Sequence, residues 1–154
     1  MGKLDTINSI ESSCVIIGLD SKLARAIAQH ESNYNQYAVR FEPKWKYFEY
    51  PEKFAQALGI TLETERTLQM MSFGPMQVMG SVCRELGYSL CLTELFNLSE
   101  GVHMGCLKLQ SLCNKYSVLS DVISAYNQGS PLKENGIYKN QNYVDSVLEI
   151  YNPL

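Results

Sequence analysis

The chain has 154 residues, which suits a single domain with a hydrophobic core large enough to fold unaided. Hydrophobic residues make up 45% of the sequence and charged residues 19%, a globular composition that excludes intrinsic disorder. The formal net charge is -3 and no run of lysines and arginines occurs, so a nucleic acid is not an expected partner.

The cysteines and histidines argue against a disulfide framework and against a metal centre. The five cysteines are odd in number and lack a C-x-x-C pair, so we interpret them as small core residues of a reduced chain. Cys106 and Cys113 are spaced to share one face of a helix. Since only two histidines occur, the sequence predicts no metal site and no cofactor.

The N-terminal residues lack the hydrophobic region of a signal peptide, and no stretch is long and apolar enough to span a membrane. We therefore expect a protein that is made in the cytoplasm, does not insert into a membrane and acts as a monomer.

Helical spacing predicts a first helix over residues 4–17, ended by Gly18. Asp20 then caps a helix over residues 21–30, which leads into Glu31 and a turn-forming run rich in Asn and Tyr. One side of a carboxylate at this position faces the core and the other is open. Burial without a cationic partner raises the pKa of a glutamate, as a general acid requires. Taken alone, the stretch favours a solvated glutamate near a helix end.

An aromatic-rich stretch with three cations and two prolines follows over residues 39–51, which predicts a loop or a short irregular element. A small β element fits within residues 40–50. Rings beside polar groups suit stacking on sugars, and the same rings equally suit pinning this stretch onto the domain. The aromatic residues are Phe41, Trp45, Tyr47, Phe48 and Tyr50.

Two short helices are predicted next, over residues 51–58 and from Thr61 or Thr64 onwards. After them, Ser72 to Gly74 is predicted to form a turn, with Pro75 at the first position of a further helix.

The second half of the chain indicates helices separated by turns. A turn of helix over residues 93–96 precedes a longer helix capped by Ser99, and another helix covers residues 122–126. A polar loop then leads to a last helix capped by Asn140 or Asn142. Because no convincing strand pattern and no internal repeat occurs, we predict one mostly α-helical domain over all 154 residues.

Four short segments, taken in their order along the chain, form a recognisable pattern. They are Glu-Ser-Asn-Tyr-Asn at residues 31–35, Ser-Phe-Gly-Pro-Met-Gln-Val-Met at 72–79, Ala-Tyr-Asn-Gln-Gly at 125–129 and Asn-Tyr-Val at 142–144. Each lies at a predicted helix end or turn, and together they resemble the lytic transglycosylases related to goose-type lysozyme, over most of the chain. The resemblance implies a lysozyme-like domain with an aromatic-rich insertion and peptidoglycan as substrate. The particular residues of the segments further resemble those of phage-encoded members.

The resemblance makes Glu31 the catalytic acid. Cleavage of a glycosidic bond needs a proton for the leaving oxygen, and most glycosidases add a second carboxylate as nucleophile or base. Glu42 and Glu65 are the candidates, but both are better interpreted as solvated or loop-anchoring charges. The family instead cleaves the β-1,4 bond between N-acetylmuramic acid and N-acetylglucosamine with help from the N-acetyl group. Glu31 would then act as base on the 6-hydroxyl of the same sugar, which yields a 1,6-anhydro end.

Roles in substrate binding are carried over for the residues of the second segment. Gln77 is expected to hydrogen-bond an N-acetyl group or a sugar hydroxyl, and Gly74 to let the glycan approach the backbone closely. Met79 is expected to pack against a sugar, or else to belong to the core. Ser72 is expected to contact the carboxylate or to cap the following helix.

Two residues of the third segment are also expected at the site. Tyr126 would hydrogen-bond near the carboxylate of Glu31 and steer it, unless it is simply a core residue. Asn127 would hold the adjacent backbone or the substrate, although turn formation explains an asparagine there equally well.

The chain departs from the family pattern at three places. Gly101 stands where Asn is usual, with Gly105 retained, which puts the local packing in question. Arg40 stands where simple members often have Ser. The gap between Glu31 and Ser72 is longer than in compact members and accommodates the aromatic-rich insertion.

Two alternatives to a lytic transglycosylase stay open at this stage. One is a hydrolase with the product of a lysozyme-type muramidase, and the other is a non-catalytic glycan-binding module of a tail or wall assembly. Without an export signal, some partner or event is expected to bring the protein to the cell wall. Release by a holin and carriage in a virion are both compatible with the sequence.

Overall fold

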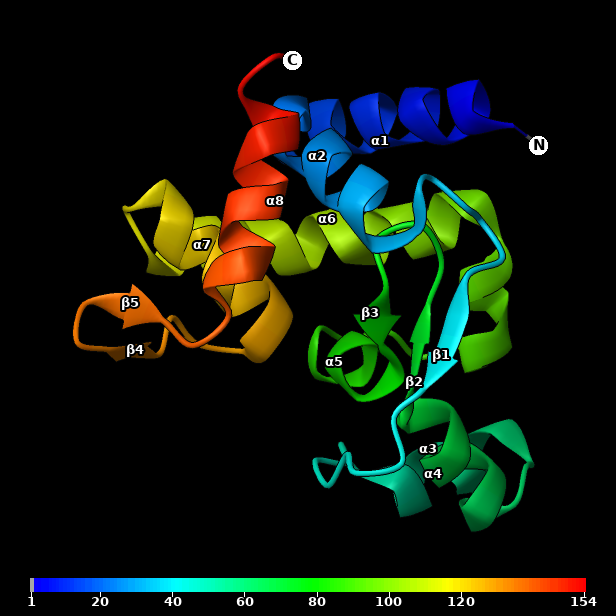
Figure 1. Ribbon diagram of the computed structural model, residues 1–154. Coiled ribbons are helices and arrows are strands. Elements are labelled where there is room, and N and C mark those ends of the chain that lie inside the picture. Colours follow the sequence, from blue (N-terminus) through cyan, green and yellow to red (C-terminus); the bar gives the residue numbers. More distant parts are fainter. Residues whose placement is uncertain (1) are drawn as a thin grey trace.

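The computed structural model describes residues 2–154, and over these residues it has eight α-helices, one 3-10 helix and two small sheets (Figure 1). The helices are α1 (Lys3–Ile17), α2 (Ser21–Ser32), α3 (Pro51–Leu58), α4 (Leu62–Gln69), α5 (Gly80–Glu85), η1 (Leu92–Phe96), α6 (Leu98–Lys115), α7 (Leu119–Gln128) and α8 (Gln141–Tyr151). The strands are β1 (Val39–Phe41), β2 (Met71–Phe73), β3 (Val78–Met79), β4 (Lys133–Glu134) and β5 (Ile137–Tyr138). The predicted mostly helical domain is confirmed.

Local sequence signals determine the first two helices. Gly18 ends α1 with a positive φ of 70°, and the Asp20 side chain caps α2 by accepting a hydrogen bond from the Lys22 amide at 3.0 Å. The helix after Asp20 is longer than predicted and ends at Asn33, which adopts a left-handed conformation with φ 51°. Glu31 therefore lies in the last turn of α2.

The segment from Ser72 to Met79 is a β-hairpin, so the predicted turn at Ser72–Gly74 and the predicted helix from Pro75 are wrong. Ser72 pairs with Met79, and α5 begins only at Gly80. Gly74 and Gln77 have positive φ values of 70° and 49°, which no α-helix accommodates. β1 adds a third antiparallel strand, so a small β element does occur at the start of the aromatic-rich stretch.

Helix α6 lies at the centre of the molecule, with α1 packed along it and η1 and α7 also in contact (Figure 1). Its buried face includes Val102, Cys106 and Leu109. A Cβ at Gly105 would lie 2.5 Å from the Met76 sulfur, and a Cβ at Gly101 would lie 2.5 Å from the Leu95 carbonyl oxygen. The Met76 side chain packs against α6 at Gly105 and the Leu95 backbone lies against it at Gly101, so no Asn fits at position 101.

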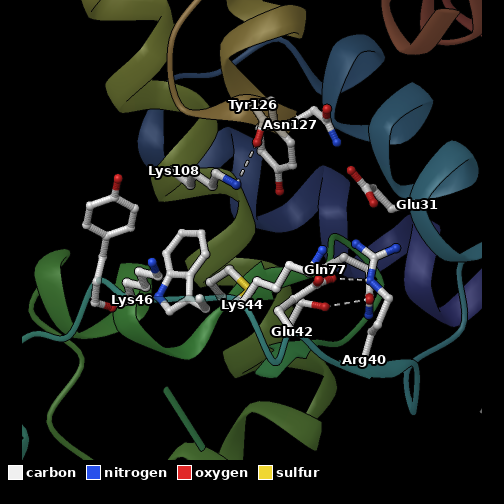
Figure 2. A pocket seen from close by; sticks show the side chains of 13 residues that line it. Glu31, Arg40, Glu42, Lys44, Lys46, Gln77, Lys108, Tyr126 and Asn127 are labelled. Atoms are coloured by element: carbon white, nitrogen blue, oxygen red, sulfur yellow. Dashed lines mark hydrogen bonds and ion pairs between the residues drawn. The ribbon is translucent and has the colours of Figure 1, made fainter. Parts of the chain in front are cut away.

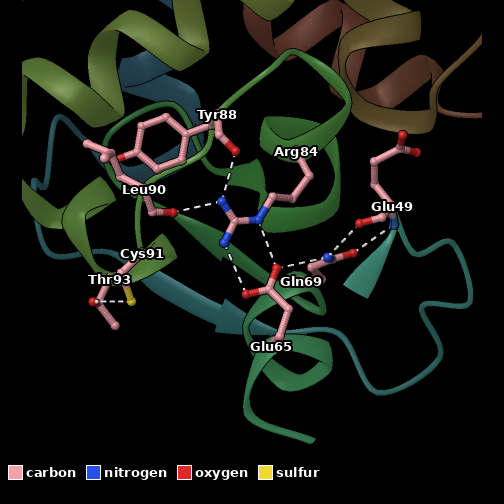
Figure 3. Close-up of polar contacts among 8 residues, drawn as sticks. All are labelled: Glu49, Glu65, Gln69, Arg84, Tyr88, Leu90, Cys91 and Thr93. Atoms are coloured by element: carbon pink, nitrogen blue, oxygen red, sulfur yellow. Dashed lines mark hydrogen bonds and ion pairs between the residues drawn. The ribbon is translucent and has the colours of Figure 1, made fainter. Parts of the chain in front are cut away.

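A buried ion pair connects α4 and α5 (Figure 3). Arg84 Nε and Nη2 donate to the two carboxylate oxygens of Glu65 at 2.8 and 3.0 Å, and both side chains are fully buried. Arg84 Nη1 also donates to the backbone carbonyls of Tyr88 and Leu90. This network holds two helices and the loop after α5 together from a single guanidinium.

The network continues into the aromatic-rich stretch through Gln69. The Gln69 carboxamide donates to Glu65 at 2.9 Å and bonds both backbone groups of Glu49, at 2.8 and 3.0 Å. Residues 42–50 contain no helix or strand, and Gln69 attaches the end of this irregular run to the buried ion pair.

All five cysteines are free thiols. Cys14, Cys83 and Cys106 are buried as predicted, whereas Cys91 is partly exposed and Cys113 is exposed, so the prediction of core positions is wrong for Cys113. The fully buried residues of α6 end at Leu109, and in its last turn Leu112 is partly buried against the core whereas Cys113 faces solvent.

Residues 2–154 include neither a membrane-spanning helix nor a metal-binding cluster. None of the helices is both long enough and apolar enough to cross a membrane. No cluster of three or more His, Cys, Asp or Glu side chains is placed to hold a metal ion within the same residues.

Candidate active site

A cleft of about 450 Å³ contains Glu31 (Figure 2). Of the other predicted site residues, Ser72, Gln77, Met79, Tyr126 and Asn127 line the same cleft, and only Gly74 does not. The structure thus brings together residues from α2, the β2–β3 hairpin and α7. The remaining residues that line the cleft are Arg40, Glu42, Lys44, Trp45, Lys46, Tyr47 and Lys108.

The carboxylate of Glu31 is held by Tyr143, which donates a hydrogen bond from its hydroxyl to Oε1 at 2.7 Å. Tyr143 lies in the first turn of α8 and packs edge-on against His30 at 4.7 Å between ring centroids. Burial, followed by the adjacent Glu31 carboxylate, raises the pKa of Tyr143 far above its usual value. The phenol therefore keeps its proton and acts as a permanent donor to Glu31.

Tyr126 forms no hydrogen bond with Glu31, which corrects the expected steering hydrogen bond. Its buried hydroxyl donates instead to the carbonyl oxygen of Met76 at 2.8 Å. Since Met76 belongs to the turn of the β2–β3 hairpin, this bond fixes the hairpin against α7. Tyr126 acts on the cleft by positioning its wall, and the expected contact to the carboxylate is made by Tyr143.

Ser72 and Gln77 form a chain of hydrogen bonds across the base of the hairpin. Ser72 Oγ donates to Gln77 Oε1 at 2.8 Å, and Gln77 Nε2 donates to the carbonyl oxygen of Gly74 at 3.0 Å. Ser72 therefore neither contacts the Glu31 carboxylate nor caps a helix. Ser32 Oγ donates to the Pro75 carbonyl at 2.8 Å and ties the hairpin to the turn of α2 that carries Glu31.

Gly74, Met79 and Asn127 have different surroundings. Gly74 is buried with φ 70° in the hairpin turn, so the backbone geometry accounts for a glycine there. Met79 is only 8% exposed but reaches the cleft from its floor. Asn127 is exposed and accepts a hydrogen bond from Asn140 Nδ2 at 3.0 Å, which links α7 to the start of α8.

Lys108 also lines the cleft, a position that the sequence did not predict. Its Nζ donates to the carbonyl oxygen of Tyr126 at 2.8 Å and lies 4.0 Å from the centroid of the Tyr126 ring (Figure 2). Burial lowers the pKa of Lys108 to about 8, while the nearby Glu31 carboxylate acts in the opposite direction. The sequence did hold a signal that this lysine is partly enclosed, since Lys108 directly precedes Leu109 of the buried stripe of α6.

The two candidates for a second carboxylate lie in different places. Glu65 is the buried partner of Arg84 and does not line the cleft, which supports its interpretation as an anchoring charge. Glu42 lines the cleft with Glu31, but it forms an ion pair with Arg40. Glu31 is consequently the carboxylate in this cleft without a cationic partner among residues 2–154.

A second cavity of about 520 Å³ adjoins the first. The two share Trp45, Tyr47, Met79, Lys108, Tyr126 and Asn127 as lining residues, so together they form a longer groove. Trp45 donates from Nε1 to the Tyr47 carbonyl and packs edge-on against the Tyr47 ring. These two rings from the aromatic-rich stretch lie along the groove, whereas Phe41 and Tyr50 line neither cavity.

Comparison with known proteins adds one family. Residues 10–146 match the family model described as Transglycosylase SLT domain, which covers most of the chain. No curated protein and no solved structure matches the chain.

Proposed function

The chain belongs to the transglycosylase SLT domain family, and from this membership we propose that it cleaves peptidoglycan strands with Glu31 as the single acid and base. The family implies lytic transglycosylase activity on peptidoglycan. We further propose that the bond cleaved is the β-1,4 linkage from N-acetylmuramic acid to N-acetylglucosamine, with a 1,6-anhydromuramoyl end as product.

The observation that carries this proposal is the setting of Glu31 in the cleft. Tyr143 binds Oε1 of its carboxylate, and among residues 2–154 no hydrogen bond reaches Oε2. One oxygen is therefore held and the other is available to exchange a proton with a substrate. General acid–base catalysis needs this combination of a fixed orientation and a free oxygen.

In the proposed reaction, Glu31 first donates its proton to the glycosidic oxygen as the bond to the anomeric carbon breaks. The N-acetyl group of the muramoyl sugar stabilises the positive charge that develops at that carbon. The Glu31 carboxylate then takes the proton of the 6-hydroxyl, whose oxygen bonds to the anomeric carbon and closes the anhydro ring. Because the attacking group belongs to the same sugar, no water has to be bound.

A Glu31→Gln variant tests the role of Glu31. We expect the rate of wall clearing by this variant to fall by about 10²–10⁴-fold, the usual contribution of a positioned acid–base group. Glu149→Gln serves as a matched control, since Glu149 is an exposed residue of α8 outside both cavities. An unchanged rate of clearing by Glu31→Gln would instead favour a non-catalytic glycan-binding module.

Product analysis separates the transglycosylase from a hydrolase. Mass spectrometry of wild-type digests is expected to show ends that are lighter than hydrolysed ends by one water. The position of Glu42 in the same cleft is the one observation that favours a hydrolase. If reducing muramic acid ends accumulate and a Glu42→Gln variant abolishes them, the hydrolase is the correct assignment.

A further inference from the structure

The cleft around Glu31 is more positive than the protein as a whole. Four cations line it against only two carboxylates, although the formal net charge of the chain is -3. The carboxylates are Glu31 and Glu42, and the cations are Arg40, Lys44, Lys46 and Lys108. A concave surface with an excess of one sign of charge attracts ligands of the opposite sign and raises their association rate.

Two of these cations are not used inside the protein. Arg40 is paired with Glu42, and Lys108 is bound to the Tyr126 carbonyl. Lys44 and Lys46 form neither an ion pair nor a side-chain hydrogen bond with any residue of 2–154, and both are exposed. Figure 2 shows them on the wall of the cleft opposite Tyr126 and Asn127.

The sugar rings of the proposed substrate have nothing that requires cations, because their hydroxyl and N-acetyl groups are neutral. The negative charges of peptidoglycan are carboxylates on the muramoyl side: the lactyl carboxylate where the peptide is absent, and the peptide carboxylates where it is present. An exposed ammonium group binds a carboxylate as a point charge through a flexible stem, which suits a substituent of variable position.

We propose that Lys44 and Lys46 select glycan strands that carry carboxylates on their muramoyl residues. This inference rests on the proposed function of the same cleft and specifies its substrate. The two lysines act before the chemical step, because they bind the charged substituent while the sugar backbone takes its position beside Glu31. Their effect is therefore on kcat/KM for charged strands and not on the reaction at the anomeric carbon.

The test compares a Lys44→Glu/Lys46→Glu variant with a Lys115→Glu/Lys139→Glu control. Both variants change the net charge by the same amount, and Lys115 and Lys139 are exposed outside both cavities. Each enzyme is given soluble peptide-bearing strands, the same strands after conversion of their carboxyl groups to neutral amides, and strands stripped of peptide by an amidase. Circular dichroism checks that both variants are folded.

On charged peptide-bearing strands, we expect kcat/KM of the Lys44→Glu/Lys46→Glu variant to be about 10-fold below the control, the lower end of electrostatic steering effects. On amidated strands, the two variants are expected to be equal. High salt reduces the difference on charged strands, since the Debye length falls to about 3 Å at 1 M. A loss that persists on stripped strands assigns the contact to the lactyl carboxylate, and one that disappears assigns it to the peptide.

An equal loss on amidated and charged strands would overturn the inference, and so would a loss no larger than that of the control. Failure of the proposed function has a different signature. In that case neither the wild type nor either variant produces anhydro ends from any of the three substrates.

Discussion

Tyr143 and Glu31 come from opposite ends of the sequence and form one unit. The hydroxyl of Tyr143 lies 2.7 Å from Glu31 Oε1, and its raised pKa keeps it protonated. A phenol that cannot ionise orients the carboxylate without competing for a proton. In the proposed reaction it is a positioning residue, because its contact is to Glu31.

A Tyr143→Phe variant is expected to lower kcat by about 10-fold while KM changes little, because it removes a hydrogen bond to a charged group. Tyr151→Phe is the control on the same helix. A kcat equal to that of wild type, or a loss that appears only in KM, would contradict the positioning role.

Lys108 couples the stability of the cleft wall to pH. Unfolded lysine keeps its proton up to about pH 10.4, whereas folded Lys108 loses it near pH 8. Between these values the unfolded state binds more protons, so the contribution of this group to the free energy of unfolding rises with pH. The buried thiol of Cys83, with its pKa raised to about 12, acts in the opposite direction.

The measurement therefore compares wild type with Lys108→Met, in which Cys83 is unchanged and its effect cancels. Urea unfolding at about pH 7.5 and 9 is expected to show the stability of wild type rising relative to the variant, and both pH values lie at least about one unit below the pKa of unfolded tyrosine. A difference that is the same at both pH values would mean that Lys108 does not titrate in this window.

At the scale of elements, the Glu65–Arg84 ion pair holds the helices beside the cleft. The guanidinium of Arg84 also lies 4.2 Å from the centroid of the Phe54 ring, so α3, α4 and α5 all meet at this side chain. Through Gln69 the same network fixes the backbone of Glu49 at the end of the stretch that carries Trp45 and Tyr47. The groove thus depends on a buried charge that does not line it.

Replacing Arg84 with Met is expected to cost about 3–5 kcal/mol in the free energy of unfolding, because the Glu65 carboxylate is left buried without its partner. Arg66→Met is the control, since it breaks the exposed pair of Arg66 with Glu52 and is expected to cost less than about 1 kcal/mol. Chemical denaturation measures both. Equal losses in the two variants would show that burial of the pair contributes little.

On the scale of the whole molecule, the groove lies where separate parts of the fold meet. Helices α2, α6 and α7 supply Glu31, Lys108, Tyr126 and Asn127, and the hairpin supplies the rest of the lining together with β1 and the stretch after it (Figure 2). Three cations of that lining lie within seven residues of chain, from Arg40 to Lys46. The positive cleft on a negative protein is therefore largely a property of one short segment.

The sequence by itself determined the mostly helical fold, the end of α1, the start of α2 and the position of Glu31 near the end of a helix. These follow from helical spacing and from capping by Gly18 and Asp20, which act over a few residues. The four ordered segments also indicated the family, which the match over residues 10–146 confirms. Such features depend on neighbours in the chain, and these are visible in the sequence.

Only the tertiary structure decided which side chains meet. In the structure, the hydrogen-bond partner of Glu31 is Tyr143 and not Tyr126. Lys108 lines the cleft, and Glu65 forms a buried ion pair. A hairpin also forms at residues 71–79, where Pro75 suggested a helix. Each outcome is a contact between residues far apart in the chain, or a positive φ at Gly74 and Gln77 stabilised by strand pairing. No local pattern carries that information, because the energy comes from packing against distant elements.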